Sequence, residues 1–196
     1  MNKYRIFGII SIIILLSVMV FSAFYYYGGY AAYNKYKYLT QAPLDSLDIK
    51  GSGIYVSQTN STIYINRSSN LPVMAGPMNA PSMYSFDILG LFNPTIVIMN
   101  GVTVHFKVVN IDTDSYHNFM LTEQGPPYPY MIGMESMKSG GYCFMSMMNF
   151  LPPTSSGHFY YYNFSYTFYQ PGTYWYICTY PGHAENGMYG EIIVKQ

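Results

Sequence analysis

Three residues near the carboxyl end have the types and the spacing of a metal site. Cys178, His183 and Met188 are each separated by four residues, in a stretch rich in proline and glycine. Two imidazoles and a thiolate in a trigonal plane, completed by a weak axial thioether, are the ligands of a type 1 copper site. A turn between two strands can bring three such side chains to one point, whereas alternate residues of a straight strand face opposite ways. The spacing therefore predicts a copper site that needs one more imidazole.

That second imidazole must come from one of the three other histidines in the chain. His117 is the expected ligand, because it lies where a predicted strand meets a loop and can point into the end of a sandwich. His105, in the middle of a predicted strand, and His158, at the end of a long insertion, are the alternatives. A buried cysteine beside a hydrogen-bonded histidine, with no metal, is the competing interpretation.

The elements that must position these residues are short strands. The apolar runs of residues 51–196 are rich in β-branched and aromatic residues and are separated by turns such as Asn100-Gly101. This pattern indicates an all-β sandwich or barrel, and Pro171-Gly172-Thr173-Tyr174 indicates a Greek-key tyrosine corner. Strands are predicted at 53–57, 61–66, 83–89, 95–99, 102–110, 116–121, 159–168, 173–178 and 189–195.

The first 50 residues differ from this domain. Residues 6–27 are 22 largely apolar residues without a charged side chain, long enough as a helix to span a bilayer. We therefore expect a membrane anchor at 1–30 and a linker at 31–50, with the rest of the chain exported. A cleaved signal peptide is the alternative, although its apolar region is usually shorter.

An insertion at residues 122–157 interrupts the domain predicted at 51–196. It contains Gly-Pro-Pro, Gly-Gly and Pro-Pro together with six methionines. A long insertion in a compact domain is usually a functional loop or a disordered one. Its methionines are more simply explained by adaptable apolar packing than by binding of Cu(I).

The composition excludes several classes of function. Only 9% of the residues are charged, and nine basic residues balance nine acidic ones, so no positive field is available to bind nucleic acid. Phosphate-loop and dinucleotide-binding fingerprints are absent. A dinuclear copper site would need two cysteines in one loop, but Cys143 lies 35 residues before Cys178. Four histidines are too few for a multicopper oxidase. An electron carrier is therefore expected rather than an enzyme.

The ligand loop resembles that of the cupredoxins, the family of blue copper proteins. The resemblance lies in the segment Gly182–Gly190 (GHAENGMYG) after Cys178 and in His117-Asn118-Phe119, and it covers about residues 83–196. Within the family, the loop looks like that of the rusticyanins and, still more, of the sulfocyanins. The resemblance implies a monomeric Greek-key β-sandwich that binds one copper ion. It also implies that Asn118 braces the site with Thr179 and that the Asn118 backbone N–H points at the Cys178 sulfur.

The resemblance also implies a place of action. Sulfocyanin-like proteins come from acidophilic archaea. Together with the anchor expected at 1–30, this predicts a single-pass protein of the cell membrane with its copper domain on the extracellular side. Its partners would be membrane lipid and redox proteins of a respiratory chain, such as a cytochrome or a terminal oxidase. The alternative function is copper binding for delivery, with the Met-rich insertion holding Cu(I).

Overall fold

The structure is a computed structural model that describes residues 16–19, 37–40, 53–132, 143–144 and 150–196. The chain divides into two units, Met1–Lys37 and Tyr38–Gln196. Residues 16–19 are helical, and among the described residues no helix has the length and apolar character needed to cross a membrane. Apart from 16–19, the predicted anchor at 6–27 lies outside the described residues. So does most of the predicted linker, in which Lys37–Leu39 forms a strand.

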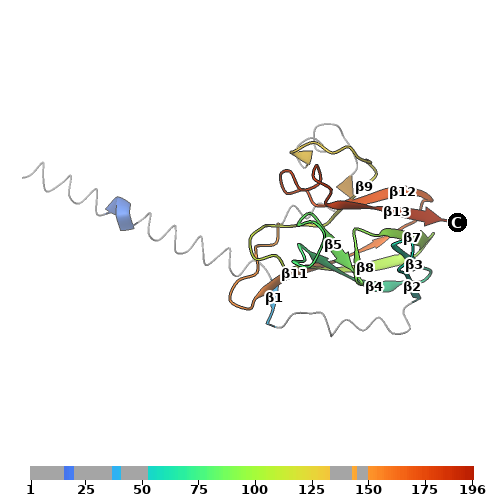
Figure 1. Ribbon diagram of the computed structural model, residues 1–196, viewed down its shortest axis with the longest axis horizontal. Coiled ribbons are helices and arrows are strands. Elements are labelled where there is room, and N and C mark those ends of the chain that lie inside the picture. Colours follow the sequence, from blue (N-terminus) through green and yellow to red (C-terminus); the bar gives the residue numbers. More distant parts are fainter. Residues whose placement is uncertain (1–15, 20–36, 41–52, 133–142, 145–149) are drawn as a thin grey trace, which may run out of the picture. The chain divides into compact units, whose positions relative to one another are not determined.

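The second unit is a sandwich of two β-sheets (Figure 1). In spatial order, the described strands of the first sheet are β1 (Lys37–Leu39), β11 (Phe159–Thr167), β8 (Thr103–Asn110), β4 (Ser69–Ala75), β5 (Phe86–Ile88) and β6 (Leu91–Phe92). Those of the second sheet are β10 (Cys143–Phe144), β9 (Met120–Thr122), β12 (Gly172–Ile177), β13 (Tyr189–Lys195), β7 (Thr95–Met99), β3 (Thr62–Ile65) and β2 (Ile54–Ser57). The predicted all-β sandwich is confirmed.

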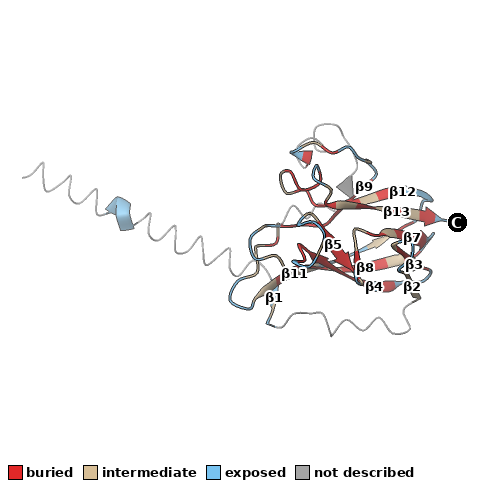
Figure 2. Ribbon diagram, in the orientation of Figure 1, coloured by how far each residue is buried: buried red, intermediate tan, exposed pale blue. Residues whose placement is uncertain are grey.

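The alternation of apolar residues along the strands builds the core. On β8, Val104, Phe106 and Val108 are buried while His105 is exposed. Figure 2 shows buried positions along strands of both sheets. Aromatic rings join the sheets: Phe86 of β5 meets Tyr176 of β12 with ring centroids 5.7 Å apart. Burial of such large rings stabilises the sandwich, and the packed core fixes the strand ends from which the loops extend.

Strand β4 is not among the predicted strands, and it contains Pro72, a residue that is rare inside a sheet. β4 pairs with β8 in parallel along its whole length, Ser69–Ala75, whereas β5 pairs only with Met74 and Ala75. Pro72 therefore lies opposite Lys107 where β4 has no partner in β5. A residue without an N–H is tolerated at such a position.

The strand predicted at 116–121 forms only in its last part, and the observed strand is shorter and begins later in the chain. The regular strand is Met120–Thr122, and His117 forms only an isolated bridge with Leu151. Its backbone N–H donates to the Leu151 carbonyl at 3.2 Å, and the Leu151 N–H donates back at 2.7 Å. His117 is thus held by the end of the insertion rather than by a sheet.

The tyrosine corner is present, because the Tyr174 hydroxyl donates to the Gln170 carbonyl at 2.9 Å. Replacing Tyr174 with phenylalanine should lower the free energy of unfolding by about 1 kcal/mol, since the carbonyl loses its partner. The exposed Tyr169, changed to phenylalanine, is the control and should alter stability by less than about 0.5 kcal/mol. Urea unfolding of the metal-free protein measures both variants, and equal stabilities would contradict the prediction.

Candidate metal centre

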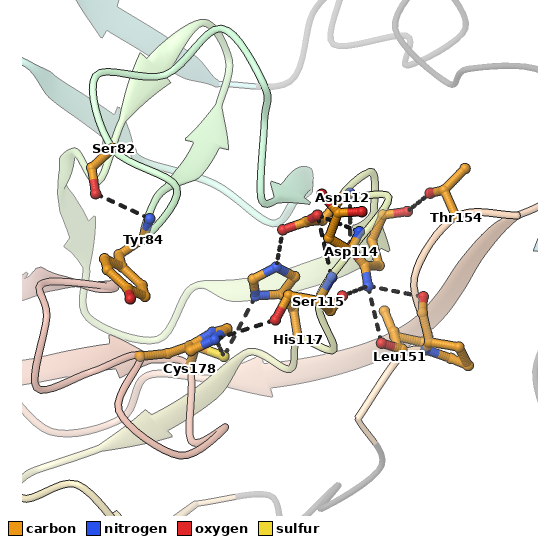
Figure 3. Close-up of polar contacts among 12 residues, drawn as sticks. Ser82, Tyr84, Asp112, Asp114, Ser115, His117, Leu151, Thr154 and Cys178 are labelled. Atoms are coloured by element: carbon orange, nitrogen blue, oxygen red, sulfur yellow. Dashed lines mark hydrogen bonds and ion pairs between the residues drawn. The ribbon is translucent and has the colours of Figure 1, made fainter.

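His117, Cys178 and His183 meet in one buried cluster. Their ligand atoms all lie within 4.8 Å of one another. The Cys178 Sγ lies 3.8 Å from the Nδ1 of His117 and 3.5 Å from the Nδ1 of His183. Figure 3 shows the His117 ring between Cys178 and Asp112. Both imidazoles therefore present the same ring nitrogen to the thiol.

The two alternative histidines lie outside this cluster. His105 is exposed on β8, and its Nδ1 lies 2.7 Å from the Ser165 hydroxyl. His158 is in the turn before β11, where its ring packs edge-on against Tyr38 with centroids 4.3 Å apart. The structure thus selects His117 from the three candidates.

The strands β12 and β13 bring Cys178, His183 and Met188 to one end of the sandwich. They pair antiparallel up to Ile177 and Tyr189, and the ligand loop begins at the next residue. The loop is closed by the Cys178 N–H, which donates to the Met188 carbonyl at 3.0 Å. The Met188 N–H in turn donates to the His183 carbonyl at 2.9 Å. Met188 is fully buried. Its backbone is thus fixed beside the other two residues.

The first part of the insertion packs against the ligand loop. Tyr128 and Ile132 form a buried apolar cluster with Met120, Ile177 and Ala184. The Gly182 N–H also donates to the Tyr130 carbonyl at 2.8 Å. Gly182 has a φ of 79°, and a Cβ atom there would lie 3.0 Å from the Tyr130 ring, so this position requires glycine. The described start of the insertion therefore supports the loop, a role that nothing in the sequence indicated.

Asn118 and Thr179 join the two ligand segments. The Asn118 side-chain amide donates to the Thr179 hydroxyl at 2.7 Å, and the Thr179 N–H donates to the Asn118 Oδ1 at 2.7 Å. Both residues are buried. The pair therefore ties the backbone next to His117 to the backbone next to Cys178, the arrangement that the family resemblance implied.

Cys178 is a free, fully buried cysteine. Burial raises the pKa of its thiol to about 12, although hydrogen bonds from the backbone of Asn118 and Tyr180 act in the opposite direction. Without metal, the residue is therefore a neutral thiol at ordinary pH. Metal binding must release this proton, because the thiolate is the ligand.

Both histidines are held neutral. Burial and, to a smaller extent, the neighbouring His117 together lower the pKa of His183 to about 4, although Asp112 acts in the opposite direction. Burial also lowers the pKa of His117, although its hydrogen bond to Asp112 acts in the opposite direction. Neutral imidazole is the form that binds metal, so burial keeps both rings ready as ligands.

Asp112 is a member of the site that the sequence did not reveal. Its Oδ2 lies 2.9 Å from the Nε2 of His117. Burial alone would raise the pKa of Asp112, but hydrogen bonds from His117, Asp114 and Ser115 outweigh it and the pKa is lowered. The carboxylate is therefore charged, and the Nε2–H of His117 donates to it.

The residues fit a copper ion. Two neutral imidazoles and a cysteine, all buried, converge through Nδ1 and Sγ, and a buried methionine follows in the same loop. Soft sulfur and imidazole ligands of this kind select copper in a type 1 site. Cys178, His117 and His183 would hold the ion, together with Met188 from the same loop.

The metal-free protein is expected to lose stability as the pH falls from about 6.5 toward 4. The pKa of His183 is about 4 in the folded protein against an ordinary value of 6.5, so the unfolded state takes up a proton first. His117 contributes in the same direction. We expect a loss on the order of 1 kcal/mol, because solvent near the site reduces the effect of the full shift.

Urea unfolding midpoints of the metal-free protein, measured at about pH 7 and about pH 4.5, check this expectation. The metal-free His183→Gln variant should show a smaller decrease between the two conditions, because it lacks one of the two groups. An equal decrease in both proteins would contradict the assignment.

Comparison with known proteins agrees with this chemistry. Residues 89–195 match the model of the copper binding proteins of the plastocyanin/azurin family. The rusticyanin of Acidithiobacillus ferridurans is 34% identical over 148 residues, which cover 74% of this chain and 70% of the relative. A rusticyanin of Acidithiobacillus ferrooxidans is 33% identical, with 74% of this chain and 84% of the relative covered.

Solved structures show the same fold. The structure of rusticyanin from Thiobacillus ferrooxidans has a TM-score of 0.65 and 29% identity, and the match covers 82% of this chain and 97% of that one. Reduced rusticyanin has the same TM-score with 28% identity, and covers 82% of this chain and 100% of the other. The resident cofactor of this protein is a type 1 copper ion, and the protein is an electron carrier rather than an enzyme. The chain belongs to the plastocyanin/azurin family of copper-binding proteins.

Proposed function

We propose that this protein is a sulfocyanin-like carrier that passes single electrons along a respiratory chain on the extracellular side of the membrane of an acidophilic archaeon. The observation that carries the proposal is the buried cluster in which His117 meets Cys178 and His183, two residues of the loop that ends at Met188. Bound copper supplies a one-electron couple between Cu(II) and Cu(I). The protein's own residues determine how much the site rearranges on electron transfer and which ligand lies nearest to a redox partner.

The site resists rearrangement, which suits electron transfer. The Asn118–Thr179 pair joins the two ligand segments, and the backbone hydrogen bonds between Cys178, His183 and Met188 close the loop. Ligands fixed in this way keep nearly the same positions in both oxidation states. Each transfer then requires little movement of the protein.

His183 is the ligand through which electrons are expected to enter and leave. His183 is 7% exposed, whereas His117 is 1% exposed and Cys178 and Met188 are fully buried. The ring packs edge-on against Tyr84 and Tyr180, both partly exposed. A redox protein that contacts this face would come nearest to the copper through His183.

Optical and EPR spectra of the copper-loaded protein, combined with a redox titration, test the proposal. An electron carrier should show a strong thiolate-to-copper absorption in the visible range and reversible one-electron behaviour. Binding of Cu(I) alone, without colour, would contradict the proposal. That result would favour a copper-delivery protein whose Met-rich insertion holds Cu(I).

The membrane anchor, the location and the partners are part of the same proposal. The uncharged run at 6–27 supports an anchor in membrane lipid. The proposal places the copper domain outside the cell, as a monomer. The low content of charged residues supports an acidic exterior, because few titratable groups make stability depend less on pH. A cytochrome or a terminal oxidase would be the redox partner.

Fractionation of the native protein tests the anchor. The full chain should need detergent for extraction and should retain residues 6–27. A protein that stays soluble without detergent and begins near residue 32 would show that a signal peptide had been removed instead.

A further inference from the structure

The turn Asp112–Ser115 lies between β8 and His117 and contacts both imidazole ligands. The Asp112 Oδ2 lies 2.9 Å from the Nε2 of His117. The Ser115 hydroxyl lies 3.3 Å from the Nε2 of His183. Each contact is made to the ring nitrogen that faces away from Cys178, since both Nδ1 atoms point toward the sulfur. One short turn thus reaches the far side of both rings.

Asp112 holds this turn as well as His117. Its Oδ1 accepts the backbone N–H groups of Asp114 at 2.8 Å and of Ser115 at 3.3 Å. Its two carboxylate oxygens therefore have separate tasks. One closes the turn that carries Ser115 toward His183, and the other accepts from His117 (Figure 3).

The turn is fixed to the sandwich by a buried residue at the end of β8. The Asn110 side-chain amide donates to the Ser115 carbonyl at 2.9 Å, and its Oδ1 accepts the Asp112 N–H at 3.0 Å. The Asp112 carbonyl also accepts the Thr154 N–H at 2.7 Å. These contacts place the turn independently of any metal.

The Asp112–His117 pair also requires a glycine next to it. Gly76 has a φ of 69°, and a Cβ atom there would lie 2.7 Å from both the Asp112 Oδ2 and the His117 Nε2. The pair thus lies directly against bare backbone at the end of β4. Such close packing leaves the carboxylate and the ring little freedom to separate.

We infer that the turn Asp112–Ser115 fixes the tautomer of His117 and the orientation of both imidazole ligands before copper binds. A carboxylate has no hydrogen to donate, so it selects the form of His117 with its proton on Nε2 and a lone pair on Nδ1. The Ser115 hydroxyl can accept from or donate to the Nε2 of His183, so it orients that ring without selecting its tautomer. Asp112 and Ser115 are thus positioning residues, and hydrogen bonds of this kind commonly change metal affinity by about 10–100-fold.

The inference rests on the copper site of the proposed function, but its first test uses metal-free protein. Long-range proton–nitrogen NMR spectra of the imidazoles report which nitrogen of each ring carries the proton. Wild-type protein should show the proton of His117 on Nε2. A copper-loaded protein that lacked blue colour would contradict the proposed function without affecting this result.

Asp112→Asn is the most informative variant, because asparagine has the same shape but only one acceptor oxygen for the two tasks. The NH2 group of the asparagine, which cannot accept a hydrogen bond, must face either His117 or the backbone N–H groups of the turn. We expect a shifted or mixed tautomer at His117 and a loss of Cu(I) affinity of about 10-fold or more, measured by competition with a chromophoric chelator. Ser115→Ala should act on His183 instead, with a smaller loss.

Asp114→Asn is the matched control. It also removes one negative charge, but from an exposed side chain two residues after Asp112. It should leave both tautomers and the affinity for Cu(I) unchanged. Backbone NMR spectra of each variant confirm that it is folded, and Ser115→Ala remains a test if an Asp112 variant is not. If Asp112→Asn and Ser115→Ala both keep wild-type tautomers and bind Cu(I) within about twofold of wild type, the inference is overturned.

Discussion

Replacing Cys178 with serine should abolish the blue colour of the copper-loaded protein. The colour of a type 1 site arises from charge transfer between the thiolate and Cu(II), and serine offers no sulfur. The buried Cys178 lies 3.5 Å and 3.8 Å from the two ligand nitrogens, so another donor cannot easily replace it. Visible absorption and EPR spectra of the variant measure the loss.

The other cysteine of the chain provides the control. Cys143→Ser removes a thiol from the same protein and should keep the blue absorption and its EPR signal. If Cys178→Ser remained blue, or if peptide mapping of the copper-loaded protein showed a disulfide between residues 143 and 178, the proposed site would be wrong.

Changes at Met188 should move the redox potential in opposite directions. Glutamine supplies a harder oxygen donor, which favours Cu(II) and lowers the potential. Leucine removes the donor from a fully buried position and should raise the potential. We expect each variant to change the ratio of Cu(II) to Cu(I) affinity by about 10-fold or more, which is about 59 mV for a one-electron couple. Both should stay blue, because Cys178, His117 and His183 remain.

Met120 is a suitable control for the loss of a buried methionine near the site. It packs with Ile177 and Ala184 in the apolar cluster next to the ligand loop. Met120→Leu should therefore leave the potential close to that of the wild type. Potentials of Met188→Gln and Met188→Leu equal to that of the wild type would make Met188 a packing residue.

Local sequence was sufficient to predict the ligand loop and the class of fold. Cys178, His183 and Met188 lie within one connection between two neighbouring strands, so their spacing alone limits how far apart they can be. The alternation of buried Val104, Phe106 and Val108 with more accessible residues likewise depends only on the period of a strand. These features follow from the geometry of short chain segments.

Only the tertiary structure decided which groups complete the site. The sequence favoured His117 over His105 and His158 as the second imidazole, but which strand end meets the ligand loop is set by the tertiary structure, and it brings His117 there. The contacts of Asp112 with His117, of Ser115 with His183 and of Tyr130 with Gly182 were not foreseen. Strand β4, with Pro72, was also missed, because its pairing depends on β8 and β5 rather than on its own residues. The contacts of Ser115, Tyr130 and β4 join segments far apart in the sequence and are set by the packing of the two sheets. Asp112 lies only five residues before His117, and its contact depends on the conformation of the turn between them.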